Sequence, residues 1–251
     1  MTAASGYVLL REKAAELDPG KVAAVLAPIL GHVRADLHRE LLDRPGVLVG
    51  GLSEYKAAMA VDALNQAGCS VFALPESDVV VPPPVREIRR GKVIEEGFLF
   101  EEADSMRLAP WSEIVYFDAV QVQTAKNVVA HDREWDTSGE EGVQFRDVAY
   151  LKLETGWQEL LEVVCYEPWV HLRIDKTTFR FNEANLPRYP TATKSYLALA
   201  IAFKTRCAAA GEGPGVELLF DGSSKTRQRL PNMKMHENLL LWRLTLRFRR
   251  P

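Results

Sequence analysis

The strongest constraint on the fold is a regular alternation of short apolar runs and helical stretches in the first 78 residues. The apolar runs are residues 7–10, 47–49 and 71–74. Between them, apolar residues recur three or four positions apart, as on one face of a helix. Asp18 followed by Pro19 is typical of a helix start, and Gly31 and Gly68 are typical of helix ends. The pattern predicts a β-α-α-β-α-β domain over residues 1–78, an open α/β sandwich.

Part of this domain, about residues 5–75, resembles the C-terminal domain of the bacterial ribosomal stalk protein, whose compact fold the Clp-protease adaptor shares. The matching pieces are Lys21-Val22, the proline before the middle strand, Gly51-Leu52-Ser53 at a helix start and Ala67-Gly68 at its end. The family's factor-binding helix carries several lysines, whereas Lys21 stands alone here. The resemblance therefore implies the fold and transfers no functional residue.

A proline-rich segment follows this domain. Residues 79–84 read Val-Val-Val-Pro-Pro-Pro, which lacks backbone donors at its prolines and favours an extended conformation. A short basic cluster comes next, with Arg86, Arg89, Arg90 and Lys92. We interpret residues 79–94 as a stiff linker, with a proline-motif docking site or a nucleic-acid arm as alternatives.

Residues 95–210 contain about seven short apolar runs that precede a single helical stretch at residues 193–209. Apolar and polar residues alternate in several of these runs, as in half-buried antiparallel strands. Seven strands and a closing helix resemble a bacterial pleckstrin-homology-like domain, and Trp111-Ser112-Glu113-Ile114 is similar to the turn that begins the third strand there. The resemblance implies an antiparallel β-barrel with a capping helix, and an α+β class for the whole chain.

The last segment, residues 211–251, is predicted to add further strands at 216–220 and 239–248, with Asp221-Gly222 as a turn. Strand alternation would place Leu240, Trp242 and Leu244 on one face of the last strand. Arg243, Arg247 and Arg249 would then share the opposite face. This basic face is the first candidate for a partner-binding surface.

Charge is strongly segregated along the chain, although the formal net charge is only −3. Residues 95–167 carry a net charge of −12, and residues 168–251 carry +9. Consecutive strands of one sheet could pair these segments, or the basic segment could form an open binding face. Aromatic residues are not interleaved with its arginines, which weighs against nucleic acid.

Catalytic motifs are missing from the sequence. There is no Walker loop, HExxH, GxSxG or CxxC, and the glycine-rich residues 211–215 follow a helix rather than a strand. His131, Asp132 and Asp136 fall in an acidic stretch that could hold a divalent metal, although a solvated loop is the simpler interpretation. We predict no cofactor and no enzyme activity.

These observations favour a non-enzymatic, cytoplasmic protein-interaction module that binds a protein or peptide. The alternatives are an anionic ligand, nucleic acid or acidic lipid, on the basic face, and a metal-dependent enzyme. The cytoplasmic expectation rests on three widely separated cysteines and on an apolar N-terminal run too short for a signal peptide. No stretch reaches the roughly 18 apolar residues of a membrane-spanning helix.

Overall fold

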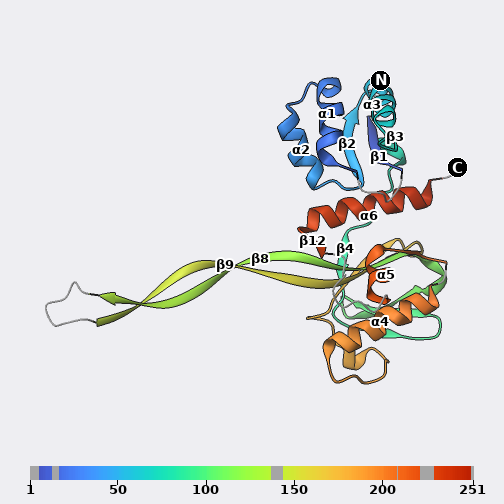
Figure 1. The fold of residues 1–251 in the computed structure, drawn as a ribbon. Helices are drawn as coiled ribbons and strands as arrows, with labels where there is room; N and C mark the ends of the chain where they lie inside the picture. Colours follow the sequence, from blue (N-terminus) through green and yellow to red (C-terminus); the bar gives the residue numbers. More distant parts are fainter. Residues whose placement is uncertain (1–5, 13–16, 137–143, 208, 221–228, 250–251) are drawn as a thin grey trace.

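The computed structural model describes residues 6–12, 17–136, 144–207, 209–220 and 229–249. Two sheet-containing layers lie on either side of a long C-terminal helix, and a two-stranded ribbon extends far from the body (Figure 1). The fold is mixed α and β, in agreement with the predicted class. None of the helices in the described ranges is long and apolar enough to cross a lipid bilayer.

The N-terminal layer has the predicted β-α-α-β-α-β order. Its elements are β1 (Tyr7–Arg11), α1 (Pro19–Leu30), α2 (Arg34–Leu42), β2 (Val47–Leu52), α3 (Glu54–Gln66) and β3 (Val71–Pro75). The central strand β1 is antiparallel to both neighbours. The helix ends lie where local signals place them: Asp18 Oδ1 accepts a hydrogen bond from Gly20 N at 2.8 Å, and Gly31 adopts a left-handed φ of 74°.

The predicted linker contains two short strands that belong to sheets of the second half. A short 3₁₀ turn, η1 (Glu76–Asp78), precedes it. Strand β4 (Val85–Glu87) pairs in parallel with β10 (Val170–Asp175). Strand β5 (Gly91–Val93) joins β6 (Gly97–Glu102) and β7 (Ser105–Pro110) in a three-stranded antiparallel sheet. The basic cluster is partly neutralised, because Arg86 pairs with Glu102 and Arg90 pairs with both Glu101 and Glu183.

The largest sheet has the strand order β11-β8-β9-β10-β4, with β12 pairing with β8. The new members are β8 (Ile114–Asp136), β9 (Gln144–Cys165), β11 (Gly211–Glu212) and β12 (Arg229–Leu230). No sheet of the described residues closes into a barrel, so the predicted pleckstrin-homology-like barrel is not what this sequence forms. The reason is that β8 and β9 pair with each other along their whole length and run outward instead of curling around a core.

Helix α4 (Ala192–Arg206) covers this half and confirms the helix predicted at residues 193–209, apart from its last turn. The ring centre of its fully buried Phe203 lies 5.3 Å from that of Phe98 and 5.2 Å from that of Trp111. Trp111 belongs to the 3₁₀ turn η2 (Trp111–Glu113). One of the seven apolar runs that indicate strands, residues 178–181, is instead a turn that leads into η3 (Phe181–Glu183).

The predicted C-terminal β extension is wrong, because both of its long strands are helices: α5 (Pro214–Phe220) and α6 (Met233–Phe248). Helix α6 has two apolar stripes. Leu239, Trp242 and Leu246 pack with β1 and β8 residues, whereas Leu240, Leu244 and Phe248 pack with Tyr116 and Val164. Each stripe has helical spacing, but together they place an apolar residue at every even position from 240 to 248, which imitates the alternation of a strand.

Helix α6 thereby joins the two sheets. Leu9 of β1 faces the helices α1–α3, and its neighbours Val8 and Leu10 face α6. The Trp242 indole Nε1 donates to Arg11 O at 2.7 Å, and the ring lies against Gly46, where a Cβ would come within 2.4 Å of Trp242 Cβ. A glycine is needed there because helix and strand approach so closely.

Asn238 links the same helix to the start of β2 by hydrogen bonds. Its Oδ1 accepts hydrogen bonds from Gly46 N (2.9 Å) and Val47 N (3.0 Å), and its Nδ2 donates to Val47 O (2.9 Å). We expect Asn238→Ala to lower the free energy of unfolding by about 1–3 kcal/mol, because backbone groups lose their partners. Urea denaturation measures this, with Asn127→Ala on the exposed ribbon as a control expected to change stability by less than about 0.5 kcal/mol. Equal stabilities of the two variants would contradict it.

Candidate functional site

The predicted basic face is divided by the helical conformation of α6. The Arg243 Nη1 donates to Glu212 O at 3.5 Å, and Arg247 donates to Ala209 O. These two arginines line a hollow of about 420 Å³ beside β11. Arg249 points elsewhere, with its guanidinium 4.0 Å from the ring centre of Phe72 in β3. The structure therefore brings Arg243 and Arg247 together and separates Arg249 from them.

The predicted metal candidates lie near the far end of the ribbon. His131, Asp132 and Asp136 are all in β8, so the loop expected at their positions is a strand. His131 is exposed, whereas the side chains of Asp132 and Asp136 lie outside the described residues. Within the part of the chain that the structure describes, no group of three His, Cys, Asp or Glu side chains could hold a metal ion.

The ribbon itself is the most conspicuous surface of the molecule, and we call residues 123–136 and 144–157 the arm. Partner strands accompany β8 only as far as Val122 and β9 only as far as Leu160. Beyond these points, β8 and β9 pair only with each other among the described residues, in unbroken antiparallel register to Asp136 and Gln144. At about 3.3 Å per residue, the arm spans roughly 45 Å. Figure 1 shows it leaving the body as an isolated twisted hairpin.

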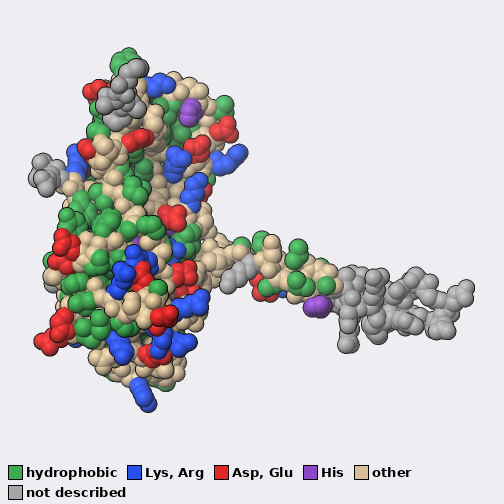
Figure 2. Space-filling model, turned by 180° about the vertical axis from the view of Figure 1, so that it is seen from behind, with side chains coloured by type: hydrophobic (Ala, Val, Ile, Leu, Met, Phe, Trp, Pro, Cys, Tyr) green, Lys and Arg blue, Asp and Glu red, His purple; other side chains and the backbone are tan. Residues whose placement is uncertain are grey.

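Register determines which side chains share a face of the arm. Leu151 is opposite Val129, Leu153 is opposite Asn127, and Trp157 is opposite Gln123. Side chains alternate along each strand, so these odd-numbered residues share one side, which we call the arm face. Val129 is 62% exposed, Leu151 72% and Leu153 62%. Figure 2 shows the same concentration of apolar side chains on the described part of the arm.

The opposite side of the arm is more polar. Lys152 and Glu154 lie there and form an ion pair at 3.8 Å, next to Tyr150, which is 46% exposed. Apart from His131 near the far end, the described side chains of the arm face are uncharged. The arm therefore has an amphipathic pattern, and beyond Trp157, whose ring Arg229 contacts at 5.3 Å, no layer of described residues covers its apolar side. The apolar run at residues 148–153 is one of those that indicate strands, but it does not indicate that this strand leaves the body.

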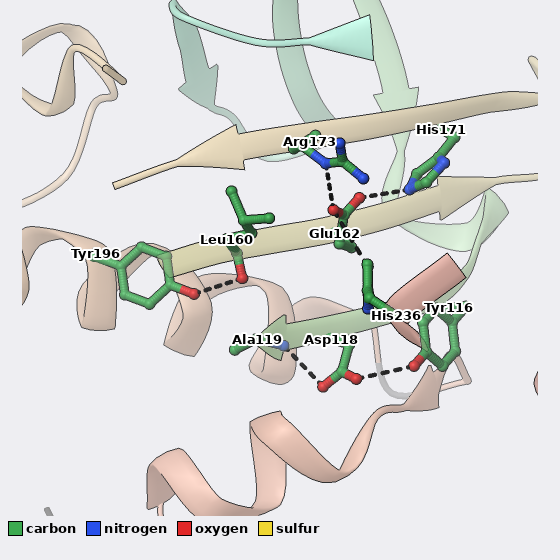
Figure 3. Close-up of polar contacts among 9 residues, drawn as sticks. All are labelled: Tyr116, Asp118, Ala119, Leu160, Glu162, His171, Arg173, Tyr196 and His236. Atoms are coloured by element: carbon green, nitrogen blue, oxygen red, sulfur yellow. Dashed lines mark hydrogen bonds and ion pairs between the residues drawn. The ribbon is translucent and has the colours of Figure 1, made fainter. Parts of the chain in front are cut away.

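A second constellation lies inside the protein, where the large sheet meets α6 (Figure 3). Glu162 of β9 is at its centre and is completely buried. His171 Nε2 contacts Glu162 Oε2 at 2.5 Å, Arg173 Nε donates to Oε1 at 2.5 Å, and His236 Nε2 of α6 lies 3.3 Å from Oε1. Burial alone raises the pKa of this carboxyl, but the contacts with His171 and His236 outweigh it and leave the pKa below its ordinary value.

Asp118 of β8 forms the other half of this constellation. Its Oδ2 accepts from Tyr116 Oη at 3.1 Å, and its Oδ1 accepts from Ala119 N (2.8 Å) and Gly215 N (2.9 Å). Burial raises the pKa of Asp118, although the nearby His236 and Arg243 lower it. Burial, with the adjacent Asp118 carboxylate, also raises the pKa of Tyr116.

These groups hold structure together rather than form an open reaction centre. Glu162 is 0% exposed, and His171 and His236 are each 2% exposed, so a substrate would have to displace α6 to reach them. Arg173 occupies the same carboxylate and disfavours a cation there. Cross-strand pairing of Glu162 with Arg173, and of Glu159 with Lys176, also confirms that the acidic and basic segments neutralise each other in part.

The three cysteines of the chain all lie at described positions. Cys69, Cys165 and Cys207 are buried and not joined in disulfides. Burial raises the pKa of both Cys165 and Cys207 to about 12, so neither is a thiolate at neutral pH.

Comparisons with protein-family models, with curated proteins and with solved structures find no match for this chain. The resemblance to the ribosomal stalk domain therefore stays a prediction, whereas the barrel implied by the pleckstrin-homology-like resemblance is not formed by the described residues.

Proposed function

We propose that this chain is a non-enzymatic protein-interaction module and that it binds a protein partner through the arm. The observation that carries the proposal is the arm face, where Val129, Leu151 and Leu153 are each more than 60% exposed. The three free cysteines support a reducing, cytoplasmic environment.

The energetics of a β-ribbon support this proposal. A two-stranded hairpin is marginally stable in water, and three strands or a packed layer are ordinarily needed. Among the described residues, the arm continues for roughly 45 Å without a third strand or a packed layer. Burying one leucine side chain is worth about 1.5–3 kcal/mol, so covering Leu151 and Leu153 would supply a substantial part of a binding free energy. Exposed apolar patches of this kind commonly mark interaction sites.

The mode that fits best is strand addition. Along the arm, the outer edges of β8 and β9 have no strand partner among the described residues. Their backbone N–H and C=O groups can pair with an extended segment of another protein. Alternate side chains of that segment would then extend the arm face and meet an apolar surface of the partner.

The anionic-ligand alternative now rests on fewer residues. Arg243 and Arg247 share one hollow, but each already donates to a backbone carbonyl, and Arg249 is elsewhere. Binding there would weaken steeply with salt. Binding by the described part of the arm face would change little with salt, because its described side chains carry almost no charge.

The arm proposal is tested by paired substitutions on β9. Linear peptides that bind the wild-type protein are first selected from a displayed random library. Replacing Leu151 and Leu153 together by serine should weaken these peptides at least about tenfold, because the apolar contact is lost. Isothermal titration calorimetry measures the affinities, and thermal unfolding should be nearly unchanged because both leucines are exposed.

The matched control replaces Lys152 and Glu154 together by serine. This variant changes the same strand and leaves the net charge unchanged, but it alters the opposite side of the arm. We expect affinities within about twofold of wild type, since exposed ion pairs contribute little. Equal losses in the two variants would contradict the proposal. So would a loss seen only when Arg243, Arg247 and Arg249 are replaced by alanine.

A further inference from the structure

A second surface feature, away from the arm, lies where the N-terminal layer meets the start of α6. It is a hollow of about 400 Å³ bounded by α1, α2, β2 and the first turn of α6. Its walls are mainly apolar, with Leu17, Val22, Leu41, Leu48 and Met235 among them. A volume of this size is in the range of small-molecule sites.

One charged side chain in this wall is unusual. Arg11, the last residue of β1, is only 8% exposed. Its guanidinium makes no hydrogen bond or ion pair with any residue in the described ranges, and its Nε is buried without a partner. The group lies 4.1 Å from the ring centre of Trp242, and this cation–π contact supplies no acceptor for the buried Nε–H.

Burying the Arg11 guanidinium in this way costs free energy unless an anion lies beside it. A buried charge ordinarily has a counter-charge, and an unsatisfied buried donor costs free energy. Arg243 lies 5.6 Å from the centre of the same indole ring and adds a like charge instead. Burial and the Arg243 charge lower the pKa of Arg11 to about 10, so the guanidinium is still protonated at neutral pH.

We propose that this hollow binds a small aliphatic carboxylate, with the carboxylate on the Arg11 guanidinium and the alkyl group against the apolar wall. The planar guanidinium matches a carboxylate through two parallel hydrogen bonds. The wall has no other free cation among the described residues. Arg44, which also lines it, donates to Leu48 O at 3.4 Å and lies 3.6 Å from Glu40.

One available cation and an apolar wall together define the ligand class. A doubly charged phosphate would bring more charge than Arg11 neutralises into an apolar hollow, which is unfavourable. A neutral alkyl compound would leave Arg11 unpartnered. An alkyl chain or apolar amino-acid side chain that carries one carboxylate satisfies both requirements. This inference is independent of the arm.

The test is calorimetric titration of the full chain with octanoate and with octanol. We expect saturable binding of octanoate and at least about tenfold weaker binding of octanol, because a charge-assisted hydrogen bond is lost. Arg11→Met should show the same loss for octanoate while octanol binding is retained. Arg44→Met, in the same wall but already partnered, should bind octanoate within about twofold of wild type.

Two further measurements keep the inference falsifiable. Leu42→Trp adds bulk at a half-exposed position of the wall and should block octanoate even if Arg11→Met folds poorly. N-acetyl-leucine and its amide distinguish a peptide carboxyl terminus from a fatty acid as the source of the carboxylate. No saturable binding of either carboxylate would overturn the proposal. Equal binding of octanoate and octanol, or unchanged octanoate binding in Arg11→Met, would overturn it as well.

Discussion

Replacing Glu162 by glutamine is expected to lower the free energy of unfolding by about 3–5 kcal/mol at neutral pH. Glutamine keeps the shape of the side chain but removes the negative charge on which Arg173 and the two histidines converge. The loss is large because the remaining Arg173 is 9% exposed and would be left with a buried charge and no counter-charge.

The position of Glu162 explains why this charge matters for the whole molecule. His171 and Arg173 belong to β10, whereas His236 belongs to α6. One carboxylate therefore connects two strands of the large sheet and the helix that carries the N-terminal layer. Weakening it should loosen the docking of α6 in addition to the local strand pair.

The pH dependence has a definite sign. The pKa of Glu162 is lower in the folded protein than its ordinary value of 4.5. Its ionised form is therefore preferred on folding, and the stability that it contributes is present above about pH 4.5 and lost as pH falls towards the folded-state pKa. The stability difference between wild type and Glu162→Gln should narrow accordingly in acid.

Urea denaturation at neutral pH and below pH 4.5 measures both effects. Glu154→Gln is the matched control in the same strand, where an exposed pair with Lys152 should contribute less than about 1 kcal/mol. A Glu162→Gln variant as stable as this control would show that the buried carboxylate is not a stabilising centre. A difference that grows as pH falls would contradict the assigned direction of the pKa.

The N-terminal layer could be predicted from sequence because each boundary has its own local signal. Asp18 begins a helix, Gly31 ends one, and Ser53 Oγ accepts a hydrogen bond from Lys56 N at the start of another. Such signals depend only on neighbours in the chain. These signals can therefore be recognised in the sequence without knowing the tertiary contacts.

The second half depends on contacts between distant residues, and there the local signals failed. The two apolar stripes of α6 imitate a strand because the helix is buried against two sheets. The acidic stretch that begins at His131 resembles a loop, but it continues β8 into the arm. The sequence shows Glu162 within an apolar run, and it shows His171 and Arg173 at alternate positions. Only the pairing of β9 with β10 and the packing of α6 bring these side chains and His236 together. Arg11 gave no signal at all.

Alanine at Gly215 or Gly213 is expected to be at least about as damaging as an overpacked core, lowering the free energy of unfolding by about 3 kcal/mol or more. Neither glycine has a left-handed φ, so the backbone conformation does not require glycine at these positions. A Cβ at Gly215 would lie 1.7 Å from Ala119 O, and one at Gly213 would lie 1.9 Å from Asp118 Cγ. The glycine-rich segment, whose composition suggested a phosphate loop, instead lets the chain close over the Asp118 carboxylate.

The two overlaps differ in kind, and this difference gives a sharp test. The three closest atoms to a Cβ at Gly213 all belong to the Asp118 side chain, whereas the closest atom at Gly215 is a backbone oxygen. In an Asp118→Ala background, Gly213→Ala should therefore lower the free energy of unfolding much less than it does in the wild-type protein. Gly215→Ala should lower it by nearly the same amount in both backgrounds. Gly50→Ala is the control, because its Cβ would meet only ordinary contacts at 3.5 Å or more. Double-mutant cycles from urea denaturation measure the coupling. Equal coupling of both glycines to Asp118, or none for Gly213, would mean that the chain does not close over this carboxylate as described.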